Sequence, residues 1–548
     1  MNDTRNIPAQ LDAVVVGAGF SGLYMLYKLR RLGMSAKVVE AGADVGGTWY
    51  WNKYPGARCD VESMHYSYSF DRELEQEWEW TEKYPSQPEI HAYISHVADR
   101  HDLRRDIVLN TKVTEARFDE ESSRWTVRTD EGDEVSARYC IMAVGCLSKP
   151  KLPEIPGIEN YTGNWYHTSH WPEERVDFSG QRVAVIGTGS SGIQAIPILA
   201  ERADHLTVFQ RTANFSLPTF NGPIDQDLVA GIKAEYPRIR EEARMSGFGI
   251  AVEEPTQSAL EVDDEERRSK YTERWNRGNL TGVLQAYTDL LVDERANETA
   301  AEFVRGKVRE VVRDPEKAEI LCPRGYAFGT KRPCLDTGYY ETFNREDVDL
   351  VDLRATPLVE ITENGVRTTE REHEFDSIVF ATGFDAMTGA LLSIDIVGRD
   401  GVSLQEKWAE GPTTYLGLTT TGFPNLFTIT GPGSPSVLSN MIVSIEQHVD
   451  WISDLLSHMS QQELAVVEPT ESAEKQWSDH VQECGEATLF TKTDSWYMGA
   501  NVPGKPRVFM PYIGGVGPYR QKCDEVAANG YEGFALQKAD DTALDPIS

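Results

Sequence analysis

Two short apolar runs in this chain, Ala13–Val16 and Val183–Ile186, each lead into a glycine-rich turn and then a segment with helical spacing of apolar residues. Short runs of this kind predict buried strands, so each turn is expected to join a strand to a helix. Glycines spaced G-x-G-x-x-G in such a turn let the backbone approach a pyrophosphate, and the helix N-terminus adds N–H donors. The pattern therefore predicts two dinucleotide-binding units. Their glycines are Gly17, Gly19 and Gly22 in the first copy, and Gly187, Gly189 and Gly192 in the second.

The strand that follows each predicted helix ends differently in the two units. Glu40 closes the run Lys37–Glu40 in the first, whereas Gln210 and Arg211 occupy the matching place in the second. A carboxylate there accepts hydrogen bonds from a ribose diol and repels a 2′-phosphate, whereas an arginine attracts one. We therefore expect FAD in the first unit and NADPH in the second.

Further apolar patterns outline the rest of the chain. Alternation within 107–129 predicts strands such as Trp125–Arg128. The runs Tyr139–Gly145 and Ser377–Gly383 predict the strand that closes each unit. Apolar residues at helical spacing predict a helix over Val437–Met459.

These elements predict an α/β fold with two Rossmann-like dinucleotide-binding domains. The FAD-binding domain is expected to have its first part at 1–148 and its second part at 389–548. The NADPH-binding domain is expected at 149–221 and 325–388. Residues 222–324, charged and helix-prone, are expected to form a solvated helical insertion in it.

The charge balance narrows the possible partners. The 54 basic and 87 acidic residues give a formal net charge of −33, which argues against nucleic acid or an anionic membrane. No apolar run of about 18 residues is present, and the polar segment 1–11 lacks the apolar centre of a signal peptide, so a cytoplasmic protein is expected. NADPH is itself an anion and needs a local basic pocket, for which Arg211, Lys331 and Arg332 are candidates.

Two other features bear on the site. The seven cysteines are scattered and form no C-x-x-C pair, which fits reduced thiols and offers neither a metal site nor a redox-active disulfide. The segment 412–445 carries no charged residue. In so acidic a chain, we expect that segment to lie inside the protein, close to a ligand.

The segment Tyr161–Pro172 resembles the signature F-x-G-x-x-x-H-x-x-x-W-(P/D) of type I Baeyer–Villiger monooxygenases. Tyr161 replaces the usual phenylalanine. The similarity extends over nearly the whole chain and is greatest to the phenylacetone and steroid monooxygenases, then to cyclohexanone monooxygenase. The matching signature residues are Gly163, His167, Trp171 and Pro172, and the other similar segments are 45–60, 329–332, 381–385, 431–441 and 495–501.

The resemblance implies an FAD enzyme that uses NADPH and dioxygen to convert ketones to esters or lactones through a flavin C4a-peroxide, with sulfoxidation as a side activity. Arg332 matches the catalytic arginine of the family, and Asp60 matches the acid that orients it. A guanidinium in a dry pocket suits an anionic oxygen. His167 is expected to fix loop hydrogen bonds rather than to transfer protons. A monomer or weak homo-oligomer is expected.

The resemblance also assigns contacts for each ligand. The FAD contacts are Gly17, Gly19, Phe20, Gly22, Glu40, Gly47, Thr48, Trp49, Trp51, Asp60, Tyr66 and Val113. The NADPH contacts are Arg58, Gly187, Thr188, Gly189, Ser190, Ser191, Gly192, Gln194, Arg211, Thr212, Lys331, Arg332 and Trp496. The substrate pocket is assigned to Ser436, Val437, Leu438 and Met441.

Three other functions compete with this one. A flavin monooxygenase that hydroxylates nitrogen or sulfur needs no arginine to stabilise an anion, so Arg332 and the Trp171-Pro172 ending favour ester formation. An NADPH-dependent flavoprotein reductase acting on disulfides is disfavoured because no C-x-x-C pair is present. A nucleotide-sensing binding protein would not need Arg332 and Asp60.

Overall fold

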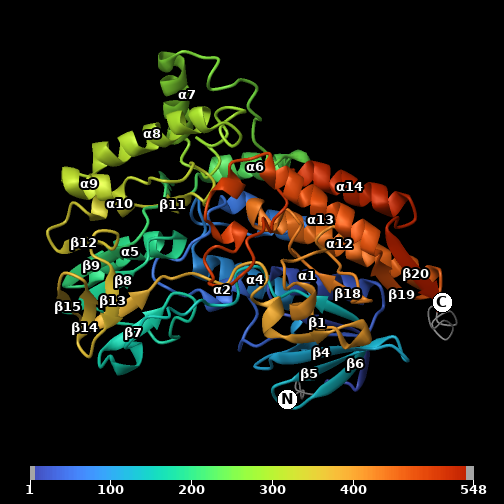
Figure 1. Ribbon diagram of the computed structural model, residues 1–548. Helices are drawn as coiled ribbons and strands as arrows, with labels where there is room; N and C mark the ends of the chain where they lie inside the picture. The colour runs from blue at the N-terminus through green and yellow to red at the C-terminus, as the bar shows by residue number, and fades with distance from the viewer. Residues whose placement is uncertain (1–6, 539–548) are drawn as a thin grey trace.

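Two sheets, each built around one glycine fingerprint, organise the computed structural model, which describes residues 7–538 (Figure 1). The start of the polar segment 1–11 and the end of the predicted 389–548 part therefore lie outside the described residues. The first sheet has eight strands in the order β17-β4-β5-β6-β1-β2-β3, with β18 paired to β6. Their bounds are β1 Gln10–Val16, β2 Ala36–Val39, β3 Ile107–Val108, β4 Val113–Asp119, β5 Arg124–Thr129, β6 Glu134–Met142, β17 Asp395–Val397 and β18 Leu426–Thr428.

The second sheet has five strands in the order β12-β9-β8-β16-β7, and all of its neighbouring pairs are parallel. Because β17 and β18 join the first sheet, the chain crosses to the second sheet and then returns. The predicted strands at 125–128, 139–145 and 377–383 are confirmed as β5, β6 and β16. The bounds in this sheet are β7 Asn164–His167, β8 Arg182–Ile186, β9 His205–Gln210, β12 Val348–Asp352 and β16 Ser377–Phe380.

The predicted helix over Val437–Met459 starts later than expected. Ser436–Leu438 forms a separate 3₁₀ turn, and α12 runs from Met441 to Gln461. Asn440 caps α12 by accepting a hydrogen bond from the N–H of Ile442 at 3.1 Å. The apolar spacing continues across this break because both the turn and the helix bury apolar side chains, so periodicity alone could not locate the cap.

The helices of 222–324 do not pack together as a single unit. Helix α6 (Gln226–Met245) lies beside α14 (Val516–Ala528) and adds Val229 and Tyr236 to the apolar core that also contains α1 (Phe20–Arg31). Its Arg240 forms a buried ion pair with Glu75 at 2.9 Å. Helices α7 (Asp264–Asn276) and α8 (Glu294–Val311) instead project at the upper end of the molecule in Figure 1. The insertion therefore touches both sheet-centred parts of the chain.

The remaining strands form three small sheets, β10-β11, β13-β14-β15 and β19-β20, apart from the two large ones. Helix α1 packs on α12, and this contact covers one face of the first sheet. Within residues 7–538, no helix is long and apolar enough to cross a membrane. All seven cysteines are free thiols, and most of the uncharged segment 412–445 is buried, as expected. The other bounds are α1 Phe20–Arg31, α2 Thr48–Trp51, α3 Arg72–Glu77, α4 Gln87–Arg100, α5 Ser190–Arg202, β10 Ser216–Pro218, α9 Pro315–Leu321, β11 Cys334–Asp336, α10 Tyr339–Thr342, β13 Leu358–Ile361, β14 Gly365–Thr368, β15 Glu372–Glu374, α11 Leu404–Lys407, β19 Leu464–Pro469, α13 Glu471–Glu486 and β20 Phe534–Lys538.

Candidate active site

The two fingerprints have nearly the same backbone. Gly17 and Gly187 have φ values of 103° and 113°, and helices α1 and α5 begin three residues after them. A Cβ added at Gly22 would lie 1.8 Å from the carbonyl oxygen of Gly17, and one added at Gly192 would lie 2.2 Å from the carbonyl oxygen of Gly187. Both positions therefore have room only for glycine. Glycine caps leave the first N–H groups of each helix available to an anion. Both turns therefore fit a pyrophosphate.

In the first unit, the carboxylate of Glu40 is buried at the end of β2. It accepts hydrogen bonds from the N–H groups of Ala18 at 2.6 Å and Gly42 at 2.7 Å. Burial raises the pKa of Glu40 despite these bonds. The N–H of Thr111 donates to the Glu40 carbonyl at 2.9 Å, which brings the segment before β4 and Val113 beside this strand end. Fingerprint, carboxylate and Val113 thus lie around one end of the first sheet, as an FAD site requires.

The loop that carries Gly47, Thr48, Trp49 and Trp51 closes over the first fingerprint. A Cβ on Gly47, which has φ 54°, would lie only 2.9 Å from the Cα of Gly19. The Trp49 indole N–H donates to the Tyr66 hydroxyl at 3.1 Å, and the Tyr66 ring lies 5.6 Å from that of Phe20. The predicted FAD residues of this loop therefore cluster next to α1.

In the second unit, the Thr188 hydroxyl donates to the carbonyl of Thr212 at 3.2 Å and ties the fingerprint to the end of β9. The exposed Arg211 stands there, and the Lys331 ammonium lies 4.9 Å from the centre of the Tyr326 ring. Burial, and then the charge of Arg211, lower the pKa of Lys331. In the part of the chain that the structure describes, neither cation has a carboxylate within 4.0 Å. Such an unbalanced positive charge fits a phosphate.

Two predicted NADPH contacts instead tie the two parts of the chain together. Gln194 on α5 accepts from the Tyr54 hydroxyl at 2.8 Å and donates to the carbonyl of Arg58 at 3.0 Å. The guanidinium of Arg58 is paired with Glu82 at 2.5 Å and also donates to the carbonyl of Tyr84. Arg58 therefore differs from Arg211, because its charge is already balanced. Ser190 lies 3.3 Å from the Cys334 thiol, and Ser191 is the next residue of the same helix turn.

Arg332 and Asp60, far apart in sequence, form a two-point ion pair. The Nε and Nη2 atoms of Arg332 donate to the two Asp60 oxygens at 2.7 and 2.9 Å, and Nη1 donates to the carbonyl of Val437 at 2.6 Å. The side chains are 23% and 22% exposed, so the pair borders an accessible space. Although burial opposes it, the Asp60 carboxylate raises the pKa of Arg332, and the guanidinium stays charged.

Two aromatic residues, Tyr497 and its neighbour Trp496, lie close to this pair. Burial raises the pKa of the Tyr497 hydroxyl to about 12, with the nearby Arg332 charge acting against the shift. The half-buried Trp496 ring lies 4.1 Å from that of Tyr497, within a 3₁₀ turn Trp496–Met498. Arg332 therefore links the loop of Asp60, the turn Ser436–Leu438 and the segment of Trp496. Sequence analysis did not single out Tyr497.

A cavity of about 150 Å³ opens beside the turn that Arg332 holds through Val437. Of the four predicted substrate residues, Leu438 lines it, whereas Ser436 and Val437 are buried next to it and Met441 starts α12. Sequence reasoning missed most of the lining. The glycine-flanked segments 246–249 and 513–515 were the available signal. The lining residues are Gly247, Phe248, Pro435, Leu438, Tyr512, Ile513, Gly514 and Gly515.

The signature segment is a structural joint. His167 Nε2 lies 3.0 Å from the Thr382 hydroxyl and Nδ1 lies 2.6 Å from that of Ser169, and burial lowers the pKa of His167 to about 4. A Cβ on Gly163 would lie 2.8 Å from the carbonyl of Asp376. Trp171, which precedes Pro172, packs on Phe178 with ring centres 6.2 Å apart. His167, uncharged and with a hydroxyl group near each ring nitrogen, therefore connects β7 to the end of β16.

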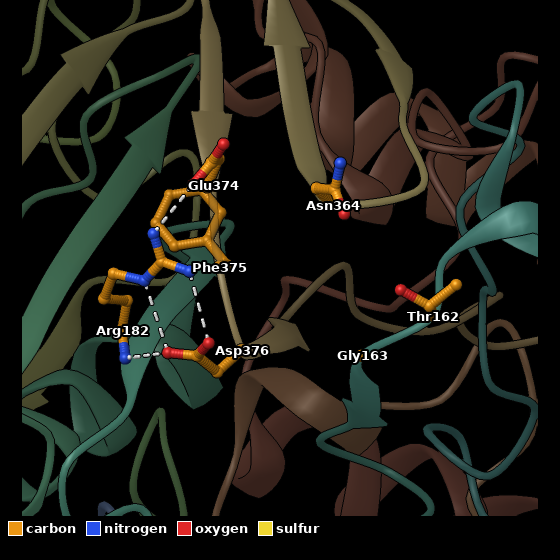
Figure 2. A pocket seen from close by; sticks show the side chains of 7 residues that line it. All are labelled: Thr162, Gly163, Arg182, Asn364, Glu374, Phe375 and Asp376. Carbon is orange, nitrogen blue, oxygen red and sulfur yellow. Dashed lines mark hydrogen bonds and ion pairs between the residues drawn. The ribbon is translucent and has the colours of Figure 1, made fainter.

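A larger pocket, of about 380 Å³, lies elsewhere and does not suit the reaction. Figure 2 shows Thr162 and Gly163 facing Arg182, Glu374 and Asp376 across it. It lies at the amino ends of β7, β8 and β16, and Arg182 is balanced by the two carboxylates at 3.1 and 3.2 Å. Ligands of open α/β sheets bind at the opposite, carboxyl ends of the strands, where both fingerprints lie.

Comparison with known proteins agrees with this geometry. A model of the pyridine nucleotide-disulphide oxidoreductase family matches residues 14–245. An acetone monooxygenase (methyl acetate-forming) from Gordonia sp. is 42% identical over 96% of this chain and 99% of its own. A Baeyer–Villiger monooxygenase from Pseudooceanicola batsensis is 42% identical over 96% and 97%. A phenazine N-monooxygenase from Lysobacter antibioticus is 43% identical over 97% and 98%.

Solved structures match over the same extent. An oxidized steroid monooxygenase bound to NADP is 52% identical, with a TM-score of 0.93, and covers 97% of this chain and 100% of its own. A closed cyclohexanone monooxygenase is 44% identical with a TM-score of 0.95 and the same coverage. A complex of OTEMO with FAD and NADP is 40% identical with a TM-score of 0.93, again with that coverage. The identities follow the expected order, steroid before cyclohexanone.

Proposed function

The chain belongs to the Baeyer–Villiger monooxygenase family, and from this premise we propose that it converts ketones to esters or lactones with NADPH and dioxygen. FAD and NADPH, when bound, supply the hydride transfer and the activation of dioxygen. The protein's share is to hold both nucleotides and to stabilise negative charge on oxygen at the reacting centre. The arrangement that carries the proposal is Arg332, fixed by Asp60 and held against the turn of the substrate cavity.

Each part of this pair has a distinct task in the proposal. Asp60 fixes the plane of the guanidinium through two hydrogen bonds, so that Arg332 need not reorganise when charge develops on a neighbouring oxygen. The ion pair also reduces the cost of placing Arg332 where water is scarce. Arg332 stays protonated throughout, so it acts as an electrostatic partner and not as a proton donor.

The remaining assignments extend the same proposal. Glu40 and the first fingerprint hold FAD, and Arg211, Thr212 and Lys331 with the second fingerprint hold NADPH. Leu438, together with Phe248 and Ile513, shapes the ketone pocket. Sulfoxidation as a side activity, a cytoplasmic location and a monomer or weak homo-oligomer belong to this proposal as well.

Oxygenation of nitrogen is the second candidate. It is supported by the phenazine N-monooxygenase, which is as similar to this chain as the Baeyer–Villiger relative is. Overall similarity therefore does not separate the two functions, and the product formed must decide between them.

A substrate panel with the purified holoenzyme tests the proposal. Cyclic, aryl and steroidal ketones, a thioether and a phenazine would each be incubated with NADPH and air, with NADPH consumption followed by absorbance and products identified by mass spectrometry. We expect ester or lactone from at least one ketone class in proportion to the NADPH consumed. N-oxide formation without any ester would favour the second candidate, and NADPH consumption without oxygenated product would contradict both.

A further inference from the structure

The strand order of the second sheet places one more arginine beside the predicted 2′-phosphate contacts. Strands β9 and β12 are parallel neighbours, and Gln210 pairs with Asp352 at their carboxyl ends. The ladder continues one residue further, because the N–H of Leu353 donates to the carbonyl of Gln210 at 2.8 Å. Arg211 follows one strand and Arg354 follows the other. Figure 1 shows the two strands side by side.

The backbone at Arg354 is held in place. Its N–H donates to the Asp352 carboxylate at 2.9 Å, which orders the first turn after β12. The side chain is exposed, and within the described part of the chain no carboxylate lies within 4.0 Å of its guanidinium. In a protein with 87 acidic and 54 basic residues, two exposed arginines at neighbouring strand ends form a local positive surface that attracts an anion.

Lys331 connects the two arginines electrostatically. Its ammonium sits on the face of Tyr326, whose hydroxyl donates to the carbonyl of Ala213 at 2.9 Å, two residues after Arg211. Burial first, then the charge of Arg211 and, more weakly, that of Arg354 lower the pKa of Lys331, whereas the charge of Asp494 acts in the opposite direction. All three cations therefore act on one region at the carboxyl ends of β9 and β12.

We propose that Arg354 is a third cationic contact for the 2′-phosphate of NADPH and, with Arg211 and Lys331, determines the preference for NADPH over NADH. The inference rests on the proposed function, because it assumes that the second fingerprint holds this nucleotide. Arginine suits the role because its planar fork donates two hydrogen bonds to one phosphate. The 2′-phosphate is absent from NADH, so only NADPH gains from this contact.

Binding to the FAD-loaded enzyme tests the inference without turnover. Dissociation constants would be measured by calorimetry for 2′,5′-ADP and for ADP, and for NADP⁺ and NAD⁺, with wild type, Arg354→Ala, Arg354→Lys and Arg211→Ala. We expect Arg354→Ala to weaken 2′,5′-ADP and NADP⁺ about tenfold, and to leave ADP and NAD⁺ within about twofold, as loss of one charge-assisted contact predicts. Arg354→Lys should recover part of the loss.

The matched control is Arg371→Ala. Arg371 is an exposed arginine in the turn between β14 and β15, also without a carboxylate within 4.0 Å among the described residues. It should change none of the four constants, and the Arg354 effect should shrink as salt is raised. Equal weakening of both nucleotide pairs, or no change, in Arg354→Ala while Arg211→Ala remains selective would overturn the inference alone. A wild-type enzyme that does not distinguish 2′,5′-ADP from ADP would overturn the cofactor assignment together with it.

Discussion

In the first nucleotide-binding unit a buried carboxylate, Glu40, follows β2, whereas in the second the exposed Arg211 follows β9 at the matching place. The turns before them are nearly identical, with helices starting at Phe20 and Ser190 after glycine caps of the same conformation. The backbone of both turns therefore suits a dinucleotide, and we expect the residue at the strand end to decide which dinucleotide binds. The ion pair Asp60–Arg332 takes one residue from the chain around each unit, so we expect the proposed reaction to depend on both units.

The largest expected effect is the loss of ester formation while both nucleotides still bind. Arg332→Ala should lower ester formation by about 10²–10³-fold, the range for losing one preorganised electrostatic partner. NADPH consumption should continue, because Arg332 lies outside both fingerprints and the other predicted NADPH contacts, Arg211 and Lys331 among them, remain. Product yield per NADPH, measured by mass spectrometry and absorbance, checks this. An unchanged yield in Arg332→Ala would remove the proposed mechanism, and Arg332→Lys should rescue only part of the loss because it lacks the planar fork.

Two neighbouring glycines of the second fingerprint should behave differently. A Cβ on Gly192 would meet the carbonyl of Gly187 at 2.2 Å, whereas a Cβ on Gly189 has no described atom within 4 Å. Gly192→Ala should therefore destabilise the protein by about 1–3 kcal/mol and lose NADP⁺ binding. Gly189→Ala should keep the melting temperature but obstruct the pyrophosphate. Thermal unfolding and NADP⁺ titration of both variants test this, and normal NADP⁺ binding by Gly189→Ala would contradict the assigned position of the pyrophosphate.

The difference between the two strand ends predicts that removing Arg211 weakens the binding of NADP⁺ but not that of NAD⁺. Arg211→Ala should weaken NADP⁺ binding by roughly 10-fold or somewhat more, and NAD⁺ binding hardly at all, because only NADP⁺ carries the 2′-phosphate. The ratio of the two dissociation constants is the measurement. Equal effects on both nucleotides would show that Arg211 supports the fold of the site instead of reading the phosphate.

The smallest effect is in the pH dependence. FAD binding uses the ionised form of Glu40, whose pKa burial raises, so FAD retention should decline on acidification earlier than for an ordinary glutamate. NADP⁺ binding uses the protonated Lys331, whose pKa burial and Arg211 lower, so affinity should decline several-fold on alkalinisation, below the ordinary lysine range. Flavin release measured across pH follows the acid limb, which is the decline of FAD retention. NADP⁺ titration across pH follows the alkaline limb, which is the decline of NADP⁺ affinity.

Lys331→Arg is the control for the alkaline limb. Because arginine stays charged, that limb should move to higher pH while the acid limb of FAD retention stays in place. If the acid decline of FAD retention and the alkaline decline of NADP⁺ affinity both moved in this variant, unfolding of the whole protein would explain them better than titration of Glu40 and Lys331.

The features that the sequence predicted correctly are those that depend on interactions between residues close together in the chain. The fingerprints and the strands β5, β6 and β16 follow from apolar runs and turn glycines, which act within a few residues. The burial of 412–445 follows from its lack of charged residues. The start of α12 was misplaced because Ser436–Leu438 and the helix bury apolar side chains alike, and the cap at Asn440 is a single hydrogen bond. The lining by Phe248 and Ile513 was missed because no spacing in the sequence links those segments.

By itself, then, the order of residues predicted two nucleotide-binding units and, through Glu40 and Arg211, which nucleotide each unit favours. Only folding decided that Asp60 reaches Arg332 at 2.7 Å, that Val437 holds the same guanidinium, and that Arg354 ends beside Arg211. The reason is physical. Turn and strand preferences depend on neighbours in the chain, whereas a cavity, an ion pair across sheets and the order of parallel strands depend on how distant segments pack.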